Sequence, residues 1–157
     1  MQFSRPAGEG QGVGFNQLFN MTQETKKMAG IIILTVPTIA YGGYFLLLLL
    51  SGQAQELALT EFQKSMFRAG HAHAGVLIIL SLVALPYIEA SQLGKTWKLV
   101  ARNSFPLAAV LMSGGFFASA TGAGLTQPNE FIAILYLGAA TLIFGLITLG
   151  IGLLKKS

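Results

Sequence analysis

Cysteine and aspartate are both missing from this sequence of 157 residues, and charged side chains of any kind are scarce. The absence of cysteine excludes disulfides, thiolate metal sites and thiol catalysis. The absence of aspartate removes most of the chemistry that depends on paired carboxylates. Charged residues make up 10% of the chain, whereas about a quarter of the residues of a soluble domain are charged. The composition therefore does not suit a water-soluble globule, and a lipid bilayer is the solvent that it fits.

The basic excess of +4 does not indicate a nucleic-acid partner. The ten lysines and arginines are scattered in ones and twos beside apolar stretches, so they form no basic and aromatic face. The sequence also lacks a phosphate-binding loop and any nucleophile arrangement. No catalytic residue of a soluble enzyme is therefore predicted.

Long stretches without a charged side chain occur four times. A helix of about 20 apolar residues crosses the ~30 Å hydrocarbon core of a bilayer. The apolar residues run continuously and do not alternate with polar ones, which excludes the strands of a membrane barrel. The sequence predicts an all-α integral membrane protein with four transmembrane helices in an antiparallel up-and-down bundle. The uncharged windows are Ala29 to Leu50, Ala69 to Ile88, Phe105 to Leu125 and Phe131 to Leu154, and they predict spans of about 29–50, 67–88, 104–125 and 131–154.

Two regions follow from this division. Residues 1–28 are polar and rich in glycine, and they include a short amphipathic stretch over 15–21. Residues 29–157 form the four-helix membrane domain. The first apolar run begins only at residue 29, so a signal peptide is not expected.

The distribution of basic residues predicts the orientation. All but two of the ten lysines and arginines precede the first window, lie between the second and third windows, or follow the fourth. By the positive-inside rule, both termini face the cytoplasm. Lys64 and Arg68 are the exceptions, and they fall in an outer loop over about 51–68. In a bacterial cell the protein would lie in the inner membrane.

Local patterns predict where two helices begin. Thr60 with Gln63 three residues later is typical of a capping box, so the second helix is expected to begin near Glu61. Ser104 followed by Pro106 favours a start for the third helix at this point, because proline is best tolerated in the first turn.

Glycines predict where the helices pack. Gly138, Gly145 and Gly152 recur every seven residues and place a smooth groove on one face of the fourth helix. Gly114 and Gly115 do the same for the third helix. Small residues allow helix backbones to approach closely in a membrane, so these positions are interpreted as packing seams.

His71 and His73 are the only groups within the predicted spans that titrate near neutral pH. An ionisable residue inside a membrane is a functional hypothesis, although a neutral imidazole can also simply bond a carbonyl or hydroxyl of a neighbouring helix. Residues two apart differ by about 200° around a helix, so the two rings point to nearly opposite faces. One helix therefore cannot aim both at a single metal ion. Each histidine serves its own site, or identical helices pool them around a symmetry axis.

A His-x-His pair on a membrane helix resembles the helix of the heme-copper oxidases whose two histidines ligate two different hemes on opposite faces. The resemblance covers residues 71–73, and the chain lacks the further helices and histidines of that family. It implies that His71 and His73 ligate heme b. The small residue Gly75 would let a flat macrocycle lie close to the helix, and Arg68 could pair with a propionate. The second axial ligand would be Met112 or a histidine of another chain.

Three functional hypotheses remain open. The first is a small heme-binding redox subunit that uses His71 and His73, assisted by Arg68 and Gly75. The second is an accessory or assembly subunit of a larger membrane complex, in which the chain binds no cofactor. The third is a copper or zinc site, or a transport pathway, where His71 and His73 of several copies converge at an oligomer axis. In all three, the expected partners are lipid and either further copies of the chain or other membrane subunits.

Overall fold

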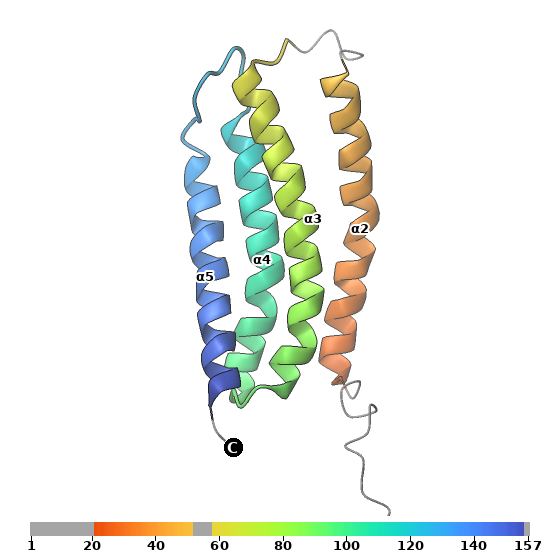
Figure 1. The fold of residues 1–157 in the computed structure, drawn as a ribbon, viewed down its shortest axis with the longest axis vertical. Helices are drawn as coiled ribbons and strands as arrows, with labels where there is room; N and C mark the ends of the chain where they lie inside the picture. The colour runs from red at the N-terminus through yellow and green to blue at the C-terminus, as the bar shows by residue number, and fades with distance from the viewer. Residues whose placement is uncertain (1–20, 52–57, 156–157) are drawn as a thin grey trace, which may run out of the picture.

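The computed structural model describes residues 21–51 and 58–155, which form four helices and, within these ranges, no strand. The helices are α2 (Gln23–Leu50), α3 (Glu61–Ala90), α4 (Lys95–Ser119) and α5 (Ile132–Leu154). Figure 1 shows them side by side with alternating directions. The expectation of an all-helical chain is confirmed. The glycine-rich segment and the amphipathic stretch over 15–21 lie outside the described residues, apart from Met21.

Three of the helices, namely α2, α3 and α5, are long and apolar enough to cross a membrane. The helix α4 is long enough but less apolar than these three, because it carries Lys95, Lys98 and Arg102 in its first half together with polar residues such as Asn103. It ends at Ser119, before the end of the uncharged window that predicted it.

The expected start of the third helix at Ser104 was wrong. Gly94 is the N-cap residue of α4, and Pro106 lies inside the helix. The hydroxyl of Ser104 donates to the carbonyl oxygen of Val100 at 2.8 Å, as a residue in a helix interior does. Proline removes one backbone hydrogen bond, but burial of this part of α4 outweighs that loss. The buried residues on both sides of the proline are Ala101, Arg102, Ser104, Phe105, Ala108 and Ala109.

The core runs along α3 and α4, and α2 packs mainly against α3 while its buried Ile32 shares a cluster with Ala109 of α4. One buried cluster joins Ile32 of α2 to Leu77, Ile78 and Leu85 of α3. Packing on α2 repeats every seven residues, as in a coiled coil, so the helix presents a narrow seam to α3. The residues of this seam are Thr25, Ile32, Ile39 and Leu46.

The glycine seam of α5 is confirmed. A Cβ atom placed at Gly138 would lie 2.6 Å from the backbone nitrogen of Met112, and one at Gly145 would lie 2.7 Å from the Cβ of Ser104. A Cβ at Gly152 would instead meet the end of the Leu93 side chain, in the connection between α3 and α4. The distances at Gly138 and Gly145 are too short for any side chain, so only glycine at these two positions allows α4 and α5 to lie this close.

The capping box at the start of α3 is also confirmed. Its Gln63 side chain has a second role, because it also contacts the connection between α4 and α5. The backbone amide of Gln63 donates to the hydroxyl of Thr60 at 3.2 Å, and the backbone amide of Thr60 donates to Gln63 Oε1 at 3.1 Å. Gln63 is 2% exposed, and its Nε2 donates to the carbonyl oxygens of Ala120 at 2.8 Å and Gly122 at 2.7 Å. The first turn of α3 thereby holds the connection between α4 and α5.

Candidate functional site

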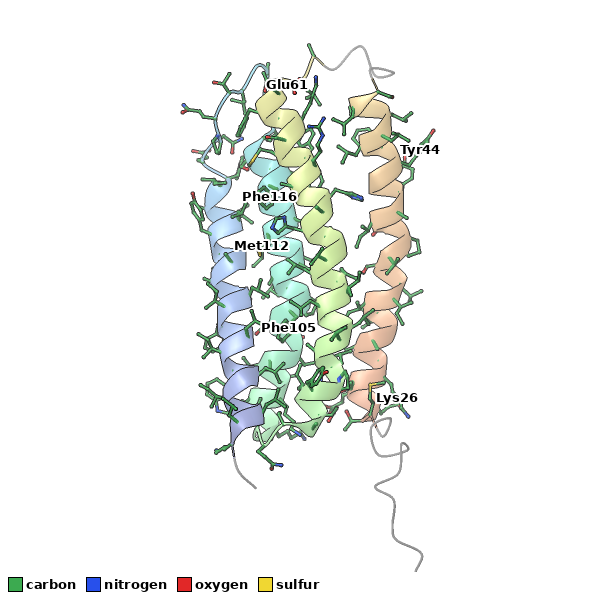
Figure 2. The ribbon with its side chains drawn as sticks, viewed as in Figure 1. Lys26, Tyr44, Glu61, Phe105, Met112 and Phe116 are labelled. Atoms are coloured by element: carbon green, nitrogen blue, oxygen red, sulfur yellow. The ribbon has the colours of Figure 1, made fainter. Side chains whose placement is uncertain are left out.

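The two histidines lie on different sides of α3, as their spacing predicts. His71 faces α2, where its ring lies against the backbone at Gly43. His73 lies beside the Phe116 ring of α4, with 4.7 Å between the ring centroids. Figure 2 shows Phe116 on α4 with Met112 about one turn away. Neither histidine is fully exposed or fully buried.

Two glycines of α2 make room for the imidazole of His71. A Cβ atom at Gly43 would lie 3.0 Å from His71 Nε2 and 3.1 Å from Cε1, and one at Gly42 would lie 3.9 Å from Nδ1. No hydrogen bond to His71 occurs among the described residues. The Nε2 atom lies close to α2 at Gly43 without being fully buried, so a ligand at this nitrogen would meet α2 on one side.

The imidazole of His73 is oriented by its own helix. Its Nδ1 atom lies 2.8 Å from the carbonyl oxygen of Ala69. A carbonyl oxygen can only accept, so Nδ1 carries the proton and, in the neutral ring, the lone pair is on Nε2. Metal-binding histidines are commonly held in this way, with one nitrogen bonded to a backbone carbonyl and the other free to ligate.

The small residues around the pair have separate roles. A Cβ at Gly70 would lie 3.0 Å from Phe117 and 3.1 Å from Phe116, so Gly70 lets α4 approach. Nothing lies within 4 Å of the position that a Cβ of Gly75 would occupy. Arg68 is exposed. Because Arg68 and Gly75 lie three and four residues from His71, all three share one face of α3.

A metal site built by this chain alone finds no support in the described ranges. They contain no group of three or more histidine, cysteine, aspartate or glutamate side chains that could hold an ion. The two imidazoles point apart, so they do not supplement each other. A copper or zinc site would need histidines from further copies.

A polar cluster around the buried Arg102 lies at the opposite end of the helices, and the sequence did not predict it. Arg102 is 6% exposed, and it donates through Nη1 to Glu24 at 3.0 Å and through Nη2 to Glu89 at 3.2 Å. The hydroxyls of Thr22 and Thr25 also donate to Glu89. We call these five residues the Arg102 cluster. It joins α2, α3 and α4 at the end where most of the lysines lie.

The signal for this cluster was present in the pattern of α4. The positive-inside rule uses Arg102 only as a charge that sets orientation. If the helix is extended back to Lys95, Arg102 falls on the same stripe as Phe105 and Ala109, which are buried. Arginine on such a stripe needs an ionised partner, and the alternating directions of the helices bring Glu24 at the start of α2 and Glu89 at the end of α3 to the same end of the molecule as Arg102.

Comparison of the chain with protein-family models, with curated proteins and with solved structures finds no match.

Proposed function

We propose that the chain is a small membrane subunit that binds heme b through the His-x-His pair of α3. The observation that carries this proposal is the fixed tautomer of His73, whose Nδ1 donates to Ala69 and whose Nε2 is left with a lone pair. A fixed neutral imidazole beside an aromatic ring is suited to axial ligation of an iron. A second axial ligand would come from outside α3.

His71 would serve a second site on the opposite face. Arg68 lies on that face and could pair with a propionate, and the open space beside Gly75 could accept the edge of the macrocycle. Gly43 of α2 lies close to His71 Nε2, so a macrocycle bound at this nitrogen would crowd α2. Because α2 packs mainly on α3, it is the helix that is held least. His73 is therefore the first ligand in our proposal, and His71 is the second.

In the proposed topology, α4 crosses the membrane together with the three more apolar helices. It packs against both α3 and α5, and the directions of successive helices alternate (Figure 1). If α3 and α5 cross, α4 must carry the chain back between them. The positive-inside rule then places the lysine-rich end in the cytoplasm and, in a bacterial cell, the chain in the inner membrane.

An accessory or assembly subunit is the second candidate, and the surface of α2 favours it. Large apolar side chains project from this helix away from α3, including Leu34 at 76% exposure and Tyr41 at 71%. This surface could be covered by lipid, by a further copy or by another subunit. In this candidate, the histidines bond helices of the partner and no cofactor is present.

Visible absorption spectra test these proposals. The protein is expressed with ample heme, solubilised gently, and recorded oxidised and dithionite-reduced, with His71→Ala and His73→Ala as variants. We expect sharp bands in the reduced wild type, a large loss in His73→Ala and a smaller loss in His71→Ala. A colourless wild type would contradict heme binding. Copurification of a partner that the double histidine variant loses would then support the accessory subunit, and stoichiometric copper or zinc would support the metal site.

A further inference from the structure

A cleft of about 380 Å³ opens between α2 and α4 at the lysine-rich end of the helices. On the α2 side it is lined by Glu24, Lys27 and Met28, and on the α4 side its lining includes Lys95, Leu99 and Arg102. We propose that this cleft binds the phosphate of an anionic phospholipid, with the acyl chains running along the apolar surface beyond it.

The charges of the lining favour an anion. Neither Lys27 nor Lys95 forms an ion pair with any residue that the structure describes, whereas Glu24 is engaged by Arg102. Apart from the pair of Glu24 and Arg102, the lining therefore holds two cationic side chains and no further carboxylate. Lys95 is also the first residue of α4, and its N-cap Gly94 makes no side-chain cap. The free amides of this first turn add positive potential beside the two lysines.

The apolar part of the surface favours a lipid over a free phosphate ion. Leu99 is 54% exposed beside the cleft, and Met28 forms part of its wall. Farther along α2, Ile31 is 51% exposed. A lipid whose phosphate lies between Lys27 and Lys95 would bury these side chains under its acyl chains. A free phosphate ion would leave these side chains uncovered, so only its electrostatic attraction to the lysines would contribute to its binding.

Native mass spectrometry of the detergent-solubilised chain provides the test, with phosphatidylglycerol and phosphatidylcholine as probes. The variants are Lys27→Gln, Lys95→Gln and the double variant. The matched control is Lys26→Gln, which removes the neighbour of Lys27 on α2, a lysine that does not line the cleft. Figure 2 shows Lys26 near the start of α2. Lys27 and Lys95 are both exposed, so no loss of folding is expected. Helical circular dichroism of each variant checks this.

We expect wild type to retain phosphatidylglycerol and to bind phosphatidylcholine more weakly. Each lysine near an anionic headgroup contributes about fivefold in affinity, so the double variant should lose more than about tenfold, and Lys26→Gln should lose little. Equal losses of phosphatidylglycerol affinity in Lys26→Gln and Lys27→Gln would overturn the proposal. The lipid would then respond to the overall positive charge of this end of the molecule and not to the cleft. Equal retention of both lipids would overturn it too, as would complete displacement of phosphatidylglycerol by millimolar inorganic phosphate.

Discussion

Gly114 and Gly115 are neighbours on α4, yet an added methyl group is expected to have opposite effects at these two positions. A Cβ at Gly115 would collide with the backbone of Leu135 on α5, whereas nothing lies within 4 Å of a Cβ at Gly114. Gly115→Ala should lower the free energy of unfolding by about 1–3 kcal/mol, because α5 must move away. Gly114→Ala should raise it by up to about 1 kcal/mol, since alanine is the better helix former.

Thermal unfolding in one mild detergent, followed by far-ultraviolet circular dichroism, measures this pair. The two variants differ from wild type by the same methyl group on the same helix turn, so each is the control for the other. Equal shifts of the midpoint in one direction would show that α5 does not pack against Gly115 in solution.

For single residues, the face of the helix on which a side chain lies could be predicted from the sequence. The residues that it contacts on other helices could not. The opposite faces of His71 and His73 follow from about 100° per residue, and the seam of Gly138 follows from the seven-residue repeat. The partners of Arg102 depend on how three helices meet. The sequence analysis therefore found the histidines and missed the Arg102 cluster.

Among the elements, the first turn of α3 fixes a neighbouring segment through the side chain of Gln63. Its side-chain amide holds the carbonyl oxygens of Ala120 and Gly122, which belong to the connection from α4 to α5. Gln63→Ala removes both hydrogen bonds and leaves a buried carbonyl of Ala120 without this donor, at a cost of about 1–3 kcal/mol. We expect faster amide hydrogen exchange over residues 120–131 and at the start of α3.

Gln127→Ala is the matched control, because Gln127 is an exposed glutamine in the same connection. Its exchange pattern should equal that of wild type. If Gln63→Ala left exchange over 120–131 unchanged, the connection would be held by other contacts, such as those of Asn129 with Ala118 and Thr121.

The bounds of the elements could be predicted where a local motif sets them. The capping box placed the start of α3 at Glu61, and that start is confirmed. The start of α4 does not follow from the uncharged window, because a helix can extend beyond its apolar part. Lys95, Lys98 and Arg102 all lie within α4, and burial of Arg102 stabilises this extension.

On the scale of the whole molecule, the four helices are joined unequally. The pair of α4 and α5 is drawn together by glycines along its full length, and α3 joins this pair through the buried core. The helix α2 adds a narrow seam and the Arg102 cluster. Insertion of a ligand at His71, or docking of a partner, would therefore displace α2 before any other helix. The contacts between helices could not be predicted from the sequence, since apolar residues all round a helix do not show which face meets protein and which meets lipid.

The complete lack of cysteine makes the topology of the molecule directly measurable, because an introduced cysteine is the only thiol in the chain. Gln92 lies between α3 and α4, and Thr126 lies between α4 and α5, and both are exposed. If α4 crosses and the lysine-rich end is cytoplasmic, Thr126→Cys should react with a membrane-impermeant maleimide in intact bacterial spheroplasts. Gln92→Cys should react only after the membrane is opened.

The unmodified chain is the control and should not react at all. Reaction of both variants from the same side would show that α4 does not cross. The opposite pattern, with Gln92→Cys accessible and Thr126→Cys protected, would retain four crossings and invert the orientation. In that case the Arg102 cluster and the two lysines that line the proposed lipid cleft, Lys27 and Lys95, would face outward. The positive-inside rule argues against this arrangement, because it would put most basic residues on the side from which that rule excludes them.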